Sequence, residues 1–219
     1  MTITLPPHRF GSSGHHKTLK QFLRFELKSL VGRLLSQKIR TPTAPLLQIG
    51  SGINPLGGFE NVDFYSTRFW RPTRHVGHDL RFPLPYRDKT FSGAFSEHTL
   101  EHLYPSQAIQ LLKEIHRVLV PGAIFRCAVP DLRKYMEFYQ GKLPNKEFSQ
   151  FHSGCEAIWS LTQNWDHLSV WDAEMLGNKL LEAGFSEVKQ RNYREGANTD
   201  LLQDLEYRKW ETLYVEAVR

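Results

Sequence analysis

Cysteine is scarce in this chain, and long apolar runs are missing from it. The 219 residues include two cysteines, Cys127 and Cys155, which argues against a disulfide framework and is typical of a reducing compartment. No apolar run is long enough to cross a bilayer, and residues 1–16 lack the charged-then-apolar pattern of a secretory signal. We therefore expect a cytoplasmic protein with one substantial hydrophobic core.

Positive charge is concentrated in the first forty residues. The formal net charge is +5, yet residues 1–40 alone carry +7, because eight Lys or Arg accompany a single acid, Glu26. Residues 41–219 carry −2. Since the larger part of the chain is not basic, we expect no nucleic-acid partner.

Residues 17–40 predict an amphipathic helix in an N-terminal extension, 1–44, that precedes the main domain, 45–219. Most basic residues lie outside the apolar stripe of this helix. Two main interpretations of the stripe stay open: it packs on protein, over a cleft or in a dimer, or it attaches peripherally to an anionic membrane surface. Binding of nucleic acid is a third and disfavoured reading. The stripe consists of Leu19, Phe22, Leu23, Leu27, Leu30, Val31, Leu34 and Leu35.

Residues 47–63, LQIGSGINPLGGFENVD, carry the strongest functional signal. A short apolar run ends in Gly50-Ser51-Gly52, and a second run ends in Asp63. In an open α/β sheet, glycines after the first strand let the backbone approach a ligand, and an acid after the next strand accepts hydrogen bonds from ribose hydroxyls. The pattern predicts a nucleoside site.

The spacing of this loop separates two kinds of nucleoside cofactor. A dinucleotide fingerprint has a third glycine where this chain has Pro55, and an acid about 20 residues after the first glycine. Here Asp63 follows Gly50 by thirteen residues, too few for the crossover helix whose N-terminus binds a pyrophosphate. A nicotinamide cofactor is therefore disfavoured, and S-adenosylmethionine, which has no phosphate, is favoured.

Later segments alternate between short strands and helices, as in α/β proteins. Residues 107–120 predict an amphipathic helix that stops at Pro121-Gly122. Short strands are expected to end at Asp79-Leu80, at Ser96-Glu97-His98 and at Pro130-Asp131.

With these motifs, residues 45–219 resemble class I S-adenosylmethionine-dependent methyltransferases of the type 11 kind. They are most similar to a small bacterial branch whose motifs read LxxGxGxNPLxGxxNVD, SxxxLEHL and a VLxPGG-like turn, in which Ala123 here replaces the usual second glycine. LLEAGFSEV (180–188) and ETLYVEA (211–217) resemble its last two strands. The resemblance implies an α/β, Rossmann-like sheet of seven mostly parallel strands with helices on both faces.

Nine residues are candidates for the cofactor site. The glycine loop is expected along the methionine part and Asp63 at the ribose, while the resemblance implies Asp79 at the adenine amino group with the Leu80 backbone beside the ring. Simpler roles stay open, since Asn54 and Asp79 suit turns, and Ser96 and Glu97 suit a helix cap. The candidates are Gly50, Ser51, Gly52, Asn54, Asp63, Asp79, Leu80, Ser96 and Glu97.

Methyl transfer to oxygen or nitrogen also needs a group that removes a proton. Candidate bases are His98, Asp131 and His167, with His152 as a further choice. Residues 98–102 also spell H-x-x-E-H, which could bind zinc with Glu174 as a third ligand. We expect no metal here, because the motif follows a strand where the resembled family has S-x-x-x-L-E-H-L. Glu101 and His102 are expected to pair, with His98 facing the cleft.

The acceptor is the least determined part of the prediction. Trp159, Trp165 and Trp171 lie near Phe148, Phe151 and His152 in the sequence, and such aromatics either stack on an acceptor or pack as a lid. The resemblance and the basic helix favour a small molecule or an envelope glycan or lipid precursor. The alternative is a non-catalytic module that binds S-adenosylmethionine and acts through a partner protein.

Overall fold

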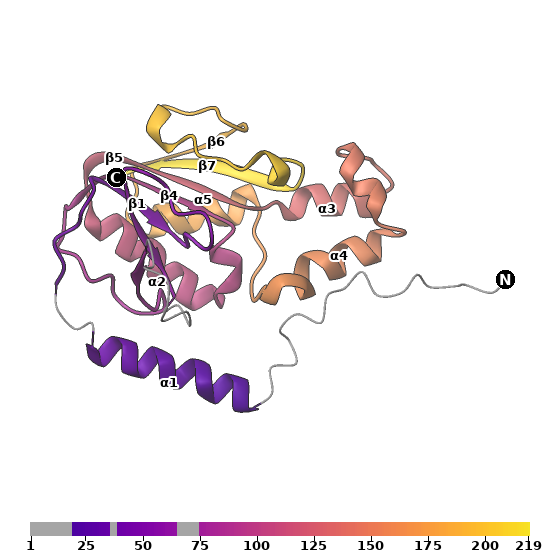
Figure 1. The fold of residues 1–219 in the computed structure, drawn as a ribbon. Helices are drawn as coiled ribbons and strands as arrows, with labels where there is room; N and C mark the ends of the chain where they lie inside the picture. Colours follow the sequence, from indigo (N-terminus) through magenta and orange to yellow (C-terminus); the bar gives the residue numbers. More distant parts are fainter. Residues whose placement is uncertain (1–18, 36–38, 65–74) are drawn as a thin grey trace.

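A seven-stranded sheet forms the centre of the computed structural model, which describes residues 19–35, 39–64 and 75–219 (Figure 1). The strand order is β3-β2-β1-β4-β5-β7-β6, and β7 is antiparallel to both of its neighbours while the other pairs are parallel. This confirms the predicted α/β, mostly parallel sheet. The strands are β1 (Leu46–Ile49), β2 (Phe59–Asp63), β3 (Val76–Gly77), β4 (Phe91–Glu97), β5 (Leu119–Pro130), β6 (Glu187–Arg191) and β7 (Thr212–Val218).

Helical segments cover the sheet on both faces. Helices α2 and α5 contribute Leu112 and Leu180 to the main core on one face, whereas the 3-10 helix η4 contributes Leu201 to a smaller cluster. The helices are α1 (Leu19–Leu35), α2 (Pro105–Val118), α3 (Leu132–Tyr139), α4 (Gly154–Gln163) and α5 (Ala173–Glu182), with 3-10 turns η1 (Leu100–His102), η2 (Lys146–Gln150), η3 (Asn164–Asp166), η4 (Thr199–Leu201) and η5 (Glu206–Arg208).

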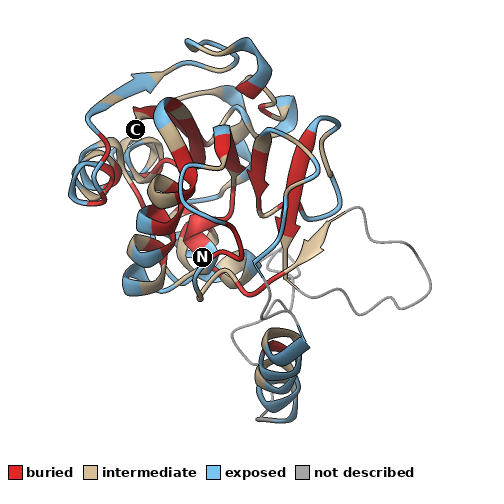
Figure 2. Cartoon of the chain, turned by 90° about the vertical axis from the view of Figure 1, so that its left-hand side faces the viewer, coloured by how far each residue is buried: buried red, intermediate tan, exposed pale blue. Residues whose placement is uncertain are grey.

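The alternation of side chains along β4 explains the two clusters. Ala94 belongs to the main core and its neighbour Phe95 to the smaller cluster, because successive side chains of a strand point to opposite faces. Figure 2 shows the buried residues following the central strands. The sheet is therefore buried on both faces, as a mostly parallel sheet requires.

The boundary between α2 and β5 differs from the prediction. The helix was expected to stop at Pro121-Gly122, but α2 ends at Val118 and β5 starts at Leu119. Leu119 pairs with Phe91 of β4, so strand pairing replaces the last helical turn. Gly122 has φ +79° and lies within β5 rather than at a helix end.

The insertion between β5 and α5 has a core of its own. Tyr135 of α3, Phe148 of η2 and Leu161 of α4 are buried together. The expected aromatic cluster is only partly formed, because Trp171 belongs to the main core while Trp159 and Trp165 are exposed. The insertion is held by Phe148, Phe151, Tyr135, Phe138 and Trp210.

Arg126 of β5 anchors the segment between β6 and β7. Its side chain is fully buried; Nε donates to Asp204 Oδ1 at 2.7 Å, and the two terminal nitrogens donate to the carbonyls of Glu195 (2.9 Å) and Asn192 (3.1 Å). A guanidinium buried without such partners would be very costly. The segment 192–204 is therefore fastened to the centre of the sheet by Arg126, and Glu216 of β7 accepts a further hydrogen bond from the Ala197 N–H at 3.0 Å.

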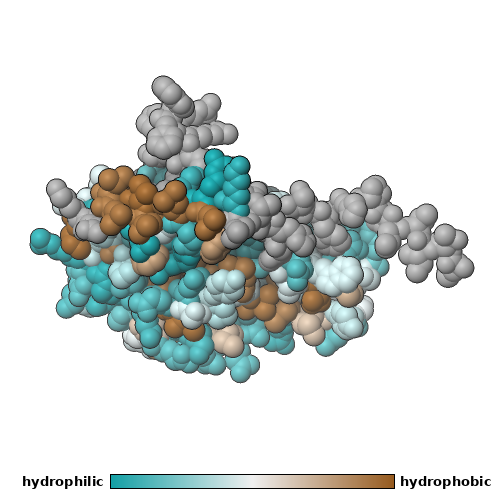
Figure 3. Space-filling view, turned by 90° about the horizontal axis from the view of Figure 1, so that it is seen from below, coloured by the Kyte–Doolittle hydropathy of each residue, from teal (hydrophilic) through white to brown (hydrophobic). Residues whose placement is uncertain are grey.

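Helix α1 lies outside the layers of the sheet, below it in Figure 1. The apolar stripe, for which packing on protein and attachment to a membrane both stay open, is exposed wherever its side chains are described, with Leu23, Leu27 and Leu34 each more than half exposed. Figure 3 shows hydrophobic atoms gathered in a patch on this side of the molecule. No helix in the described parts of the chain is long and apolar enough to span a membrane.

Candidate cofactor and active site

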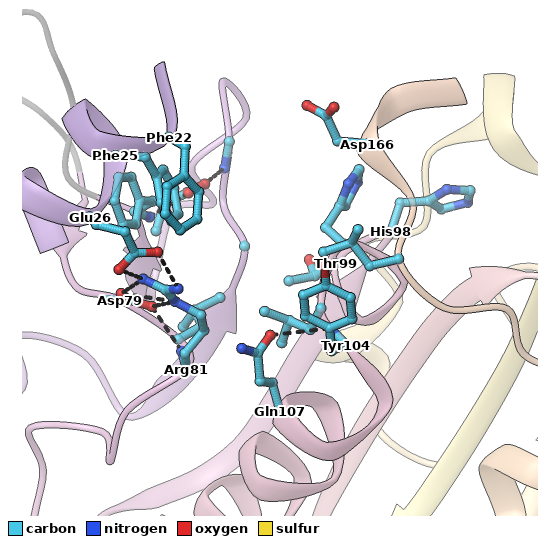
Figure 4. A pocket seen from close by; sticks show the side chains of 18 residues that line it. Phe22, Phe25, Glu26, Asp79, Arg81, His98, Thr99, Tyr104, Gln107 and Asp166 are labelled. Carbon is cyan, nitrogen blue, oxygen red and sulfur yellow. Dashed lines mark hydrogen bonds and ion pairs between the residues drawn. The ribbon is translucent and has the colours of Figure 1, made fainter. Parts of the chain in front are cut away.

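A cavity of about 600 Å³ opens at the carboxyl ends of β1, β2 and β4, between α1 and the start of α2 (Figure 4). Phe22, Phe25 and Glu26 of α1 lie on one side of it, opposite Tyr104 and Gln107. Its size is that of a pocket for a drug-sized ligand. The lining residues are Phe22, Phe25, Glu26, Gly50, Gly52, Asp63, Phe64, Asp79, Leu80, Arg81, His98, Thr99, His102, Leu103, Tyr104, Gln107, Asp166 and Leu168.

The glycine loop forms the floor of this cavity. Gly50 has φ +73° and Gly52 has φ +51°, conformations that residues with a Cβ adopt at a cost. A Cβ on Gly50 would also lie 2.0 Å from Thr99 Oγ1. Gly50 is therefore required both by its conformation and by the close approach of Thr99.

Asp63, at the end of β2, holds the loop from the side. Its Oδ2 accepts a short hydrogen bond from the Gly52 N–H, and its Oδ1 accepts one from the Phe64 N–H at 2.5 Å. A carboxylate has about four acceptor positions, so two backbone donors leave room for a ligand hydroxyl. Asp63 lines the cavity, where the sequence placed it.

Asp79 lies in a network of charges after β3. Arg81 Nη2 donates to Oδ2 at 2.8 Å and Arg81 Nε to Oδ1 at 3.0 Å, while the Ser29 hydroxyl of α1 makes a short hydrogen bond to Oδ2. Burial raises the pKa of Asp79, but the bonds from Arg81 and Ser29 together hold it below its ordinary value. Asp79 is thus an ionised acceptor at neutral pH, already bonded on both oxygens.

Helix α1 contacts the cavity through Phe22, Phe25 and Glu26. Glu26 Oε1 lies 2.7 Å from Arg81 Nη1, and the Phe25 ring stacks on Phe64 with centroids 4.3 Å apart. The Arg33 guanidinium lies 3.7 Å from the centroid of the Phe82 ring. These contacts seat α1 over the side of the cavity that Asp79 lines. One interpretation of the sequence placed the apolar stripe over the cleft; of that stripe Phe22 lines the cavity, whereas Leu23 and Leu27 are exposed.

Five of the nine predicted cofactor residues line the cavity and four do not. Gly50, Gly52, Asp63, Asp79 and Leu80 are brought together there. The other four are Ser51, Asn54, Ser96 and Glu97, which lie outside the lining.

Two of the four remaining residues, Asn54 and Glu97, are hydrogen-bonded to other residues of the protein. Asn54 is exposed, and its N–H donates to the Ser51 carbonyl at 2.9 Å, as in a turn. Glu97 accepts from the Leu205 N–H at 3.1 Å, and burial raises its pKa. Ser51 and Ser96 are both buried.

The three predicted bases occupy different places. His98 lines the cavity, and its Nε2 lies 2.8 Å from Thr212 Oγ1. Asp131 instead caps α3 by accepting from the Arg133 N–H, and burial raises its pKa. His167 is buried, and desolvation lowers its pKa. No hydrogen bond joins Glu101 and His102 within the described chain, and Glu101 Oε1 instead lies 3.2 Å from His98 Nδ1.

Several lining residues had no signal in the sequence. Tyr104 and Gln107 lie at the start of α2, where Gln107 Oε1 accepts from the Tyr104 N–H at 3.2 Å. Asp166, at the end of η3, has φ +64° and also lines the cavity. It lies more than sixty residues after the start of α2 and belongs to no recognisable motif. Arg81 could have been anticipated, because a basic residue two positions after Asp79 suits an ion pair.

Comparison with known proteins agrees with this geometry. Residues 66–127 match a family model described as a methyltransferase domain. Among curated proteins, no sequence matches the chain.

Solved structures with the same fold are numerous. One is a SAM-dependent methyltransferase from Archaeoglobus fulgidus, with a TM-score of 0.51 and 15% identity over 89% of this chain and 94% of that one. Another is the 1,6-didemethyltoxoflavin-N1-methyltransferase of Burkholderia thailandensis, with a TM-score of 0.50 and 16% identity over 89% of this chain and 77% of that one. That structure contains S-adenosylhomocysteine and 1,6-didemethyltoxoflavin. The chain therefore has the Rossmann-like fold of SAM-dependent methyltransferases, and the family-model match supports S-adenosylmethionine as its cofactor.

Proposed function

We propose that this protein is an S-adenosylmethionine-dependent methyltransferase that methylates oxygen or nitrogen of a small molecule or of an envelope glycan or lipid precursor. The observation that carries the proposal is the meeting of Gly50, Gly52, Asp63 and Asp79 in one cavity at the carboxyl ends of the parallel strands. In such sheets this edge is where ligands bind.

Each part of the cofactor has a chemically suitable neighbour. The glycine loop leaves room for the methionine part, and Asp63 has acceptor positions left for the ribose hydroxyls. Asp79 and the Leu80 backbone are assigned to the adenine. Because Ser29 and Arg81 already bond Asp79, the adenine amino group would share or replace one of those donors.

The opposite wall is assigned to the acceptor. Methyl transfer is an in-line displacement, so the acceptor atom must lie beyond the sulfonium methyl, on the side of Tyr104, Asp166 and His98. Of the three predicted bases, His98 lines the cavity, with its two ring nitrogens against Thr212 and Glu101. Asp131 and His167 are held by the cap of α3 and by the Leu161 carbonyl, respectively.

Calorimetry tests the cofactor directly. The purified chain is titrated with S-adenosylmethionine, S-adenosylhomocysteine and NAD, and binding of the first two alone is expected. Absence of binding to both would contradict the proposal. Binding without transfer to any glycan, lipid-precursor or small-molecule acceptor would favour the non-catalytic module instead.

We also propose that α1 attaches the protein to an anionic membrane surface. Leu23 and Leu27 are exposed, and Lys20 and Arg24 lie beside them around one shallow hollow. Apolar side chains flanked by basic ones suit a surface of anionic lipids, which attracts the charges and accepts the leucines.

Vesicle co-sedimentation tests the attachment. The full chain is expected to sediment with phosphatidylserine-rich vesicles and not with phosphatidylcholine vesicles. Leu27→Glu should abolish the effect, whereas Leu181→Glu, at a 50% exposed position on α5, should not. No sedimentation by the full chain contradicts the proposal, and a dimer in solution that Leu27→Glu dissociates would favour a second copy as the occupant.

A further inference from the structure

A cluster of histidines surrounds one buried carboxylate beside the cavity. Glu101 and His102 belong to η1, and His167 follows η3. One ligand atom from each of these three residues lies within 4.8 Å of the other two. His102 also lines the cavity, together with Asp166 and Leu168, the neighbours of His167. The cluster therefore adjoins the wall assigned to the acceptor.

Glu101 lacks the partners that a buried carboxylate needs. Glu101 is 1% exposed, and neither of its carboxylate oxygens has a hydrogen-bond partner within the described chain. His98 Nδ1 lies 3.2 Å from Oε1, an ion-pair distance without hydrogen-bond geometry. Because a buried carboxylate without hydrogen bonds is costly, a cation bound beside Glu101 would stabilise it.

The hydrogen bonds of the histidines leave lone pairs rather than protons for such a cation. His167 Nδ1 lies 2.6 Å from the Leu161 carbonyl, which can only accept, so Nδ1 carries the proton and Nε2 of a neutral ring has the lone pair. A bond from the second ring nitrogen to a backbone carbonyl is also how metal-binding histidines are held in orientation.

His98 follows the same logic. The Thr212 hydroxyl donates its hydrogen to the Arg208 carbonyl at 2.7 Å, so it must accept from His98 Nε2. His98 Nδ1 then faces Glu101 Oε1 at 3.2 Å, so the bond to Thr212 holds the His98 ring beside the buried carboxylate.

We propose that Glu101, His102 and His167 bind one divalent transition-metal ion of the zinc class, with His98 as a positioning residue for Glu101. Two imidazoles and a carboxylate form a ligand set typical of zinc and other first-row transition metals, whereas magnesium prefers oxygen ligands. Ligand atoms around zinc lie about 3.4 Å apart, given bonds of about 2.1 Å. The exposed side chain of His102 can make the closing movement from the observed spacing.

The site assigns a chemistry to the acceptor wall. Three protein ligands leave a coordination position for another molecule, and a metal-bound hydroxyl loses its proton more readily than a free one. A methyl acceptor that reacts through a hydroxyl oxygen is then favoured over one that reacts through nitrogen. This last step rests on the proposed methyltransferase function, whereas metal binding itself does not.

Metal binding is tested on the full chain without S-adenosylmethionine. The purified protein is stripped with a chelator and then titrated with zinc by calorimetry and with cobalt by absorption spectroscopy. We expect binding of one ion per chain, with cobalt bands in the visible range. If neither zinc nor cobalt binds, the proposal of a metal site is overturned. The result of the separate titration with S-adenosylmethionine does not depend on this outcome.

Matched variants locate the site. His102→Ala alters an exposed side chain, and Glu101→Gln keeps the size of a buried one, so folding can be checked for both by thermal unfolding. Each should weaken zinc binding by at least about tenfold, since even residues that only orient metal ligands matter by that factor. His152→Gln, at an exposed histidine elsewhere, and a joint His15→Ala, His16→Ala variant should bind as the unaltered chain does. Unchanged binding by His102→Ala and Glu101→Gln would overturn the assignment.

Discussion

The glycines of the loop differ in how well they tolerate substitution by alanine. Gly50 and Gly58 both have positive φ, but a Cβ on Gly50 would lie 2.0 Å from Thr99 Oγ1, whereas nothing lies within 4 Å of one on Gly58. Gly58→Ala should therefore cost about 1 kcal/mol of unfolding free energy, from backbone strain alone. Gly50→Ala should cost about 3 kcal/mol, because overpacking is added to the strain. Denaturant titration measures both values, and equal losses would contradict the contact with Thr99.

Asp63 is the residue on which cofactor affinity should depend most directly. Asp63→Ala removes the acceptor assigned to the ribose and releases the Gly52 N–H from its partner. We expect S-adenosylmethionine to bind at least about tenfold more weakly, since a hydrogen bond to a charged group contributes about 1.5–3 kcal/mol. Asp88→Ala, which alters a surface ion pair with Arg117, is the matched control for calorimetry. Equal affinity in both variants would remove Asp63 from the site.

Among the elements, α1 is held over the cavity by few contacts. Glu26→Gln weakens the pair with Arg81, whose atoms lie 2.7 Å apart and are partly exposed, so the effect on global stability should be less than about 1 kcal/mol. The amides of 22–33 should nevertheless exchange hydrogen faster, because the helix loses one of its attachments. Lys28→Gln on the same helix provides the control. Identical exchange in both variants would show that Glu26 does not hold α1 in place.

Elements formed by local patterns could be predicted from the sequence, and those formed by distant contacts could not. The ends of β1 and β2 were evident because Gly50 and Asp63 each follow an apolar run. The orientation of α1 was not, since an apolar stripe is normally expected to turn inward. Here Glu26 reaches Arg81 and Ser29 reaches Asp79, 55 and 50 residues away, and this pairing leaves most of the stripe facing outward.

The candidate site shows the same division. Its glycine loop and two acids lie in motifs, whereas Tyr104, Gln107 and Asp166 reach the cavity only because of how α2 and the insertion pack. The cluster of Glu101, His102 and His167 was half visible as H-x-x-E-H. The motif was interpreted with His98 and His102 as ligands and Glu174 as the third, but Glu174 is exposed on α5. The sequence does not reveal that the backbone before His167 turns through positive φ at Trp165 and Asp166.

For the whole molecule, Asp79 makes the free energy of unfolding depend on pH. Its pKa is lower in the folded protein than in the unfolded chain, so its contribution to stability is complete above the unfolded value of about 3.9 and is lost as the pH falls through the folded value. Asp79→Asn should therefore flatten the decrease in unfolding free energy below about pH 4. Asp200→Asn, at an exposed position, serves as the control in urea titrations over that range. If the unfolding free energy of Asp79→Asn falls with pH as steeply as that of the unaltered chain, Asp79 is not the source of this pH dependence.

The anchorage of 192–204 by Arg126 has a consequence for the order of assembly. The guanidinium belongs to a central strand, and the groups that it binds come late in the chain, after β6. These groups can bind Arg126 only once β5 occupies its place, so this outer segment gains its buried anchor only when the central strand is formed. Most surface loops open far more easily than the core strands. If the amides of 192–204 exchange hydrogen with the same opening free energy as those of β5, this loop opens only in the global unfolding transition.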